Sequence, residues 1–469
     1  MTEINREKEV NKPSVDQLIA LNEFAYSYGL LKGKEPNVKK VSFSLNPKLF
    51  TSDQLEKLKQ GCFDFNHVIV RFLNEFPKMF KFYKDYSNGD ELLECLIDLY
   101  EKIEKRRKIP AKPVILINRN DFMYDTELCN FLQIEYNLAA SSLGFFSYGV
   151  NKLIKHYYHT HTDKKIDLIA NNYPKFQRES FKDFLEIYGN PDAYVVTLCD
   201  EEGFGYFEWN EHEKTLIEGG INCFRVKSNG FNNSMYKIDD KNNLIMNGKE
   251  IGVLYQRCLY DYSHFTEELK EFIIAVECSN CLCLPSVEAN MIGIKLNQNF
   301  LNNKKLQKQY GVTDIDMKDF GKNLCSTYLL KDHFDNDKEK MVEFIKKDLT
   351  GYLMKTFKEG GFGDILVGET MLNFINENDE NTLNRFLLVR KIKSPILPSQ
   401  AMIEGEFKQI DNSISEIGHY STIVIEHKDG KYVLKKQYGD DFLLRTKDSK
   451  TVKGGVAVNA AFVDSIRIK

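Results

Sequence analysis

A short apolar strand followed by a glycine-rich turn restricts the fold and the chemistry of this chain more than any other feature. Residues 351–354 are apolar enough for a strand, and Lys355, Glu359, Gly360 and Gly361 follow them. Backbone N–H groups of such a turn can converge on phosphate oxygens, while the lysine neutralises phosphate charge and the glutamate holds Mg²⁺. The segment therefore predicts Lys355 at a strand end, next to a phosphate-binding loop. Its spacing is neither the Walker A pattern nor the dinucleotide fingerprint, and a plain surface turn would look similar.

Length and charge limit the classes of protein to which the chain can belong. It has 469 residues, 42% of them hydrophobic, which is enough for a large core spread over two or three lobes. The net charge of −4 gives no global basic field, so we expect no nucleic-acid partner. Apolar runs fall short of the roughly 20 residues of a membrane span, and residues 1–16 are too polar for a signal peptide. A signal removed before Met1 would not be visible.

The ten cysteines are scattered along the chain, so reduced thiols are the expectation. Cys278, Cys281 and Cys283 resemble half of a zinc site, but no second ligand pair stands at finger-like spacing. Buried thiols that act as small apolar groups are the better interpretation.

Alternating helical and strand patterns predict a mixed α/β fold. Residues 91–108 keep helical spacing, and 114–117 then form a buried strand. The apolar runs 194–198 and 252–255 are separated by helical sequence, which favours a mostly parallel sheet at about 190–295.

Later strands are predicted at 386–389 and 413–417. Asp429 and Gly430 stand between two short apolar runs, 422–425 and 432–434, which is a strong signal for a β-hairpin.

Further polar segments could add chemistry to the glycine turn. Arg119 follows the strand at 114–117, and Glu135 and Asn137 share one face of an extended segment, where their oxygens suit Mg²⁺. A half-buried polar strand face would give the same pattern. Arg445 and Lys447 precede a small-residue loop, which suits anion binding under a mobile cover, although a surface strand and loop would look much the same.

Taken in order, these segments resemble eukaryotic-type glutathione synthetase, a member of the ATP-grasp ligases. The resemblance covers nearly the whole chain and is strongest at 114–144, 251–260, 351–361 and 413–461. It implies a homodimer whose ATP-grasp core and lid surround an inserted parallel-sheet substrate-binding domain, with ATP and Mg²⁺ as cofactors and a cytoplasmic location. The implied division is 1–189 for an N-terminal helical region and part of the core, 190–295 for the substrate domain, 296–325 for a connecting helical segment, 326–412 for the lid with its glycine loop, and 413–469 for the rest of the core.

On this resemblance, a nucleotide side can be assigned. Mg²⁺ is implied on Glu135, Asn137 and Glu359. Nucleotide phosphates are implied on Lys295 and Lys355, with Gly360 and Gly361 at the start of the covering loop. Glu416 and Lys447 match further nucleotide contacts.

A donor side, meaning the residues around the substrate that donates its carboxylate, is implied in the same way. Arg119 and Arg445 match positions beside the peptide substrate and the transferred phosphoryl group, and we treat them as catalytic. The other matching substrate positions are Ser142, Arg257, Tyr260, Val456 and Ala457. The implied reaction joins γ-glutamylcysteine to glycine, with ATP, through an acyl phosphate, and asks mainly for positioning and charge neutralisation.

The sequence departs from the family where a Glu-x-Asn-x-x-x-Gln pattern holds the γ-glutamyl end of the substrate. Those positions are Gly203, Gly205 and Trp209 here. A site that has lost its hydrogen-bonding partners binds an amino-acid head group poorly. A local slip of the alignment, with Glu201, Glu202 or Glu208 taking over, is the alternative. The expected function is thus a glutathione-synthetase-like ligase with an altered donor pocket. The alternative is a diverged homologue that binds ATP without making glutathione and acts on another substrate or as a secreted interaction protein.

Overall fold

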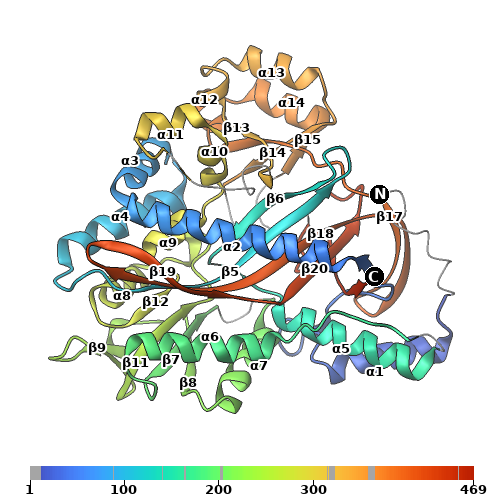
Figure 1. Ribbon diagram of the computed structural model, residues 1–469, viewed down its shortest axis with the longest axis horizontal. Helices are drawn as coiled ribbons and strands as arrows, with labels where there is room; N and C mark the ends of the chain where they lie inside the picture. Colours follow the sequence, from blue (N-terminus) through green and yellow to red (C-terminus); the bar gives the residue numbers. More distant parts are fainter. Residues whose placement is uncertain are drawn as a thin grey trace.

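A large mixed sheet forms the centre of the molecule (Figure 1), a computed structural model that describes residues 12–469 except 88, 140, 163–164, 201–203, 314, 316–322, 358–364 and 453. Its strand order is β17-β3-β21-β20-β18-β5-β6, and β19 also pairs with β18. The strands are β3 (Phe43–Ser44), β5 (Val114–Asp125), β6 (Asn130–Asn137), β17 (Leu397–Ile403), β18 (Glu406–Lys428), β19 (Lys431–Tyr438), β20 (Phe442–Asp448) and β21 (Phe462–Asp464). The long strand β18 therefore contacts most of the sheet, and its neighbours set the register of the site described below.

The predicted hairpin is confirmed at the turn between β18 and β19. Lys428 pairs with Lys431, and Asp429 and Gly430 both have positive φ, 51° and 77°. Such φ values suit the Asp-Gly pair of a two-residue hairpin turn. The strand predicted at 413–417 is also confirmed, as the middle of the longer β18.

A second sheet lies at the lower left in Figure 1, with strand order β8-β7-β11-β10-β9 and β12 beside β11. Its strands are β7 (Tyr194–Cys199), β8 (Cys223–Lys227), β9 (Tyr236–Ile238), β10 (Leu244–Met246), β11 (Lys249–Gln256) and β12 (Leu282–Leu284). The pairings of β7 with β8 and β11, and of β11 with β12, are parallel as predicted. The antiparallel β9 and β10 were not predicted, although Asn247 and Gly248, both with positive φ, form a two-residue turn between β10 and β11.

A third, antiparallel sheet has the order β13-β16-β14-β15 and its own hydrophobic core. It lies at the top in Figure 1 and comprises β13 (Thr327–Tyr328), β14 (Tyr352–Thr356), β15 (Ile365–Val367) and β16 (Phe386–Arg390). Its helices are α12 (Leu330–His333), α13 (Lys338–Lys346), α14 (Gly368–Glu377) and α15 (Glu380–Leu383). The strand predicted at 351–354 extends further than expected. Lys355 is the last but one residue of β14, close to the predicted strand end, and pairs with Leu387 on one side and Ile365 on the other.

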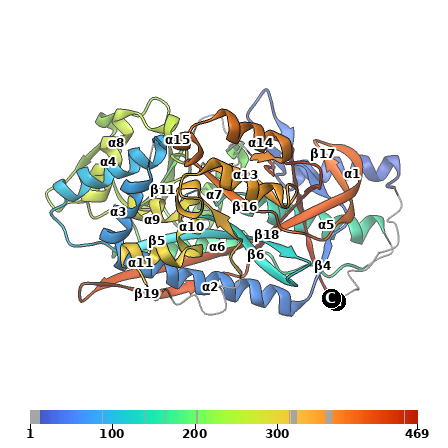
Figure 2. The ribbon, with the colours of Figure 1, turned by 90° about the horizontal axis from the view of Figure 1, so that it is seen from above.

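Helices cover the central sheet. Helix α2 runs along the sheet beside β18 and β19, as Figures 1 and 2 both show. It begins at a capping box in which Thr51 and Gln54 satisfy each other's backbone N–H groups. The described α-helices outside the third sheet, which cover the central and second sheets, are α1 (Val15–Ser27), α2 (Ser52–Asn74), α3 (Phe76–Tyr86), α4 (Glu91–Arg106), α5 (Gly144–His161), α6 (Tyr173–Tyr188), α7 (Tyr206–Glu218), α8 (Glu267–Cys278), α9 (Val287–Gly293), α10 (Leu296–Asn302) and α11 (Lys304–Tyr310).

Two sequence expectations concern the helices and the thiols. The predicted helix 91–108 is confirmed as α4, which ends at Arg106. All ten cysteines lie in the described part of the chain and carry free thiols, and Cys281 and Cys283 are buried. Among the described helices, none is both long enough and apolar enough to cross a membrane.

Candidate active site

The register of four neighbouring strands brings polar residues from distant parts of the chain onto one face of the central sheet. Arg119 on β5 pairs with Asn137 on β6, and Asp121 pairs with Glu135. Every second residue of a strand points to the same face of the sheet, so these four side chains lie together. On the other side of β5, Arg445 enters from β20, beyond β18.

Asp121 holds the two arginines of this face. Its carboxylate accepts from Arg119 Nε at 2.7 Å and Nη2 at 2.9 Å, and Arg445 Nη2 lies 3.0 Å from the same group. Asp121 has no exposed surface, and Arg119 is also buried. Bidentate pairing of this kind fixes the plane of a guanidinium as well as its position. Sequence reasoning did not select Asp121, although its spacing of two residues from Arg119 was visible.

Glu135 and Asn137 are placed together, as predicted. Asn137 Nδ2 donates to Asp121 Oδ2 at 3.0 Å, and this bond orients the side-chain amide. Glu135 Oε1 lies 3.0 Å from Lys295 Nζ. Burial would raise the pKa of Glu135, but the positive charges of Lys295, Lys355 and Arg445 together hold it well below its usual range. Glu135 is therefore ionised at neutral pH.

The two predicted phosphate lysines reach this face from different elements. Lys295 stands at the start of α10 and is largely buried. Lys355 extends from β14 of the third sheet and donates to the carbonyl of Ile134 on β6 at 3.1 Å. The positive charges of both lysines lower the pKa of Glu135.

The remaining residues that were predicted to contact the nucleotide lie on β18 and β20. Glu416 pairs with Arg445 in the strand register, and their side chains form an ion pair. Lys447 is two residues further along β20 and donates to the carbonyl of Val452 at 2.9 Å. Burial, together with the positive charges of Arg445 and Lys391, lowers the pKa of Lys447 to about 8.

At Ser142, which was predicted to lie beside the carboxylate donor, three side chains converge. Arg119 Nη1 and the Tyr420 hydroxyl donate to its carbonyl at 2.8 Å and 2.5 Å, and Arg257 Nη2 donates to its Oγ at 2.9 Å. The next residue, Leu143, has a φ of 76°, in the left-handed region that leucine rarely adopts. These three hydrogen bonds to Ser142, called the Ser142 clamp below, therefore hold the strained turn at Leu143 in a fixed position.

The other predicted donor-binding residues, Val456, Ala457 and Tyr260, take part in other contacts. Val456 is buried in the hydrophobic cluster that also contains Leu143 and Tyr420, and Ala457 is half-buried beside it. The ring of Tyr260 packs on His264, with centroids 4.9 Å apart. Glu359, Gly360 and Gly361 lie outside the described residues, as do Gly203, Glu201 and Glu202.

Comparison with known proteins decides the family. The sequence model of the family described as eukaryotic glutathione synthase, ATP binding domain, matches residues 16–468. The chain belongs to the eukaryotic glutathione synthase family. Glutathione synthetase of Homo sapiens is 23% identical over 98% of this chain and 96% of its own length, and that of Xenopus laevis is 23% identical over 93% of both. A solved structure, a glutathione synthetase-like effector from Globodera pallida in its apo form, matches with a TM-score of 0.71 at 14% identity over 97% of each chain. That likeness shows the fold.

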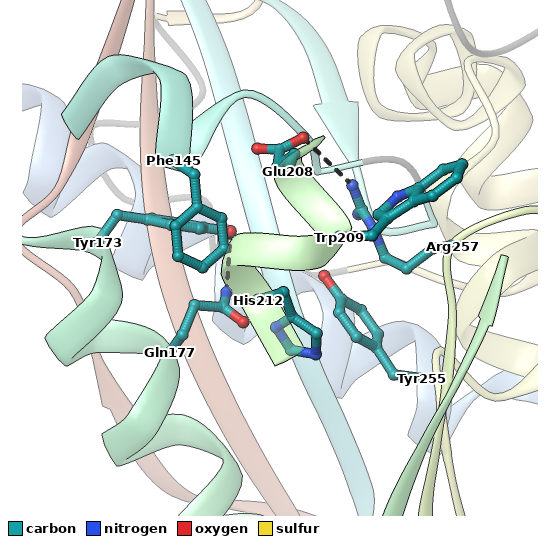
Figure 3. Close-up of a pocket in the computed structure, with 8 residues that line it drawn as sticks. All are labelled: Phe145, Tyr173, Gln177, Glu208, Trp209, His212, Tyr255 and Arg257. Atoms are coloured by element: carbon teal, nitrogen blue, oxygen red, sulfur yellow. Dashed lines mark hydrogen bonds and ion pairs between the residues drawn. The ribbon is translucent and has the colours of Figure 1, made fainter. Parts of the chain in front are cut away.

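This glutathione synthase family member has an aromatic side chain where the sequence suggested a changed donor pocket (Figure 3). Trp209 lies in the first turns of α7, and a Cβ placed on Gly205 would stand 2.9 Å from Trp209 Cε2 and Nε1. The buried indole therefore packs directly on the bare backbone of Gly205. Glu208 is one of the three acids that would take over the lost contacts to the γ-glutamyl end if the alignment slips. It is buried, and its Oε2 lies 3.9 Å from Arg257 Nη2.

Proposed function

We propose that this chain is an ATP- and Mg²⁺-dependent ligase that joins a carboxylate to an amine, of the glutathione synthetase type. The observation that carries the proposal is the ionised Glu135 surrounded by Lys295, Lys355 and Arg445. Three positive side chains from three different elements surround this one carboxylate. Such a site can exchange the ion pairs among its own side chains for ion pairs with the phosphates of a triphosphate. Membership of the family supports the same assignment.

The described residues fit the expected cation. Glu135 and Asn137 lie on the same face of β6, and the amide nitrogen of Asn137 is held by Asp121, which leaves its oxygen as the ligand atom. Among the described residues, no group of three or more His, Cys, Asp or Glu side chains converges as a metal site. Mg²⁺ usually takes one or two protein carboxylates and completes its shell with water and phosphate oxygens. When bound, Mg²⁺ would neutralise charge on the phosphates.

The protein's own residues then position the reactants. Lys295 and Lys355 hold the phosphates, and Arg119 and Arg445, both fixed by Asp121, face the transferred phosphoryl group. The donor carboxylate attacks the γ-phosphate to give an acyl phosphate and ADP. The acceptor amine then displaces phosphate and forms the amide bond. These steps require positioning, charge neutralisation and exclusion of water more than covalent chemistry by the protein.

The first experiment measures phosphate release from ATP with γ-glutamylcysteine, with and without glycine. Glycine-dependent release would establish glutathione synthesis. Calorimetry with a non-hydrolysable ATP analogue, with and without Mg²⁺, tests the nucleotide site separately. Absence of nucleotide binding would refute the proposed function.

A second candidate function is favoured by the packing of Trp209 on Gly205. In this alternative, the chain binds ATP but does not make glutathione, and it acts on another substrate or as a secreted interaction protein. ATP binding without γ-glutamylcysteine binding would support this alternative, whereas glycine-dependent turnover would exclude it.

A further inference from the structure

Asn459 lies in a tight loop, residues 454–461, between β20 and β21. The carbonyl of Gly455 accepts from Ala460 N at 3.1 Å and from Ala461 N at 3.3 Å, which closes the loop at its base. Asn459 has a φ of 56°, in the left-handed region that asparagine tolerates better than most residues. The loop is therefore a compact turn, and its side chains decide how it sits on the rest of the molecule.

The valines of this loop lie in different environments. Val456 is 2% exposed and belongs to the hydrophobic cluster of Leu143 and Tyr420, next to the Ser142 clamp. Val458, two residues later, is 52% exposed. One small buried side chain gives the loop little apolar contact with the core, so its polar contacts matter for its position.

Both ends of the Asn459 side-chain amide have partners from distant parts of the chain. Its Oδ1 accepts from Lys32 Nζ, and from Ser42 Oγ at 3.3 Å. The Asn459 side chain also hydrogen-bonds to the carboxylate of Glu404, and this bond lowers the pKa of Glu404 below its ordinary value. Lys32 Nζ in turn lies 3.4 Å from Glu404 Oε1. We call these contacts of Asn459 with Lys32, Ser42 and Glu404 the Asn459 latch.

The three partners of Asn459 belong to the sheet framework. Lys32 ends β1 (Leu31–Lys32), Ser42 directly precedes β3, and Glu404 stands in the turn between β17 and β18. Ser42 is also tied to two of these strands. Its Oγ accepts from Glu404 N at 3.2 Å, and its carbonyl accepts from Val463 N on β21 at 2.9 Å. The latch therefore joins a loop without a strand of its own to a fixed support.

The burial of Lys32 favours the closed loop. This lysine is only 6% exposed, and a buried ammonium needs both hydrogen-bond acceptors and an opposite charge. Asn459 supplies an acceptor, and Glu404 supplies the charge. A loop that opens takes the acceptor away, which leaves a buried donor poorly satisfied.

We propose that Asn459 is a positioning residue whose latch keeps the loop closed and so holds Val456 and Ala457 where they contact the carboxylate donor. Asn459 acts through these two residues and touches neither substrate. The proposal rests on the ligase function proposed above, because that function places the donor beside Val456 and Ala457. The latch itself is tested without any substrate.

Hydrogen exchange, followed by mass spectrometry on the peptide that spans the loop, measures loop opening directly. Asn459→Gly removes the amide, and glycine accepts the positive φ at no cost. Lys32→Met breaks the latch from the other side and leaves the loop sequence intact. Each variant should speed exchange in the loop about tenfold, and the double variant should be no faster than the single ones, because both changes remove the same contact.

Control variants separate the latch from general effects. Lys112→Met also removes an ammonium that backbone carbonyls hold, but on other elements, and should leave exchange in the loop unchanged. Val458→Gly adds a glycine to the same loop without touching the latch, and should change exchange less than Asn459→Gly. Circular dichroism checks folding, and Lys32→Met serves alone if Asn459→Gly does not fold. Unchanged exchange in the folded latch variants, or additive effects in the double variant, would overturn the latch.

Kinetics test the positioning role. In the phosphate-release assay, Asn459→Gly should raise the KM for γ-glutamylcysteine about tenfold and leave the KM for ATP within about twofold. The reason is that Lys295 and Lys355 lie on other elements than the loop. Calorimetry should likewise show an unchanged affinity for the ATP analogue. An affinity for the analogue that falls as much as that for the donor would overturn the positioning role. If the natural chain shows no turnover, the ligase function fails, and the exchange measurement alone decides whether the latch exists.

Discussion

Arg445 reaches from β20 past the intervening strand β18 to Asp121 on β5, where its Nη2 lies 3.0 Å from the buried carboxylate. Arg119 uses both oxygens of the same carboxylate. One acid thus fixes two guanidinium groups that approach from opposite sides of β18. Both arginines therefore share one acid, in addition to the carbonyl of Ser142 for Arg119 and the carboxylate of Glu416 for Arg445.

Asp121→Asn should therefore be strongly destabilising. The variant leaves the buried guanidinium of Arg119 without its bidentate acid and removes one of the two acids that pair with Arg445, and breaking a buried ion pair typically costs about 3–5 kcal/mol. Chemical denaturation measures the loss. Asp98→Asn is the matched control, because Asp98 pairs with Lys102 on an exposed helix face and its loss should change stability little. Equal stability of the two variants would contradict the central role of Asp121.

Glu135→Gln should weaken binding of the Mg²⁺–ATP analogue complex about tenfold or more, since the amide cannot replace a carboxylate ligand. Binding of the analogue without Mg²⁺ should change less, because Lys295 and Lys355 remain. Calorimetry at several Mg²⁺ concentrations measures both effects. Glu127→Gln, at an exposed ion pair with Lys393, is the control. Unchanged Mg²⁺ dependence in Glu135→Gln would place the metal elsewhere.

Nucleotide affinity should fall as the pH rises through about 8. The pKa of Lys447 is lowered to about 8 by burial and by Arg445 and Lys391, so this lysine is charged below that pH and neutral above it. A neutral lysine attracts phosphate less, and binding at higher pH must take up a proton. Lys447→Arg stays charged throughout and should remove this step. The nucleotide affinity of the natural chain and of Lys447→Arg should be measured between pH 7 and 9. An identical pH profile in these two proteins would rule out Lys447 as the titrating group.

Lys355→Met should weaken nucleotide binding with little loss of stability. The lysine links the third sheet to β6 through the carbonyl of Ile134, yet it is only half-buried. Lys347→Met, on an exposed helix end, serves as the control. A nucleotide affinity equal to that of the control would show that Lys355 does not contact phosphate.

The homodimer implied by the resemblance stays a prediction. Sedimentation should give about twice the chain mass of 54.5 kDa. A single species at the chain mass, over a wide concentration range, would contradict it.

Local signals in the sequence were enough to predict several elements. The Asp429–Gly430 hairpin and helix α4 depend on short-range patterns of turn residues and apolar spacing, and both are confirmed. The equally local signal of Asn247 and Gly248 was overlooked, and with it the antiparallel strand β10.

Other features depend on contacts that no short pattern encodes. Asp121 gains its importance only when β20, more than 300 positions later, is placed two strands away from β5. The sequence identified Trp209 and Gly205 as changed positions, but their direct packing follows from the helical start of α7. The strand bearing Lys355 extends beyond its apolar run because β15 and β16 pair with it on both sides.

Strand β18 bears Glu416, which pairs with Arg445, and Tyr420, whose hydroxyl donates to the carbonyl of Ser142. Four residues of extended chain separate them by about 13 Å, and both belong to a continuous strand with neighbours on either side. The strand therefore fixes the distance between these two positions, which the proposed function assigns to the nucleotide and to the carboxylate donor. In the proposed function, the spacing between ATP and the donor would thus be set by the strand before either substrate binds.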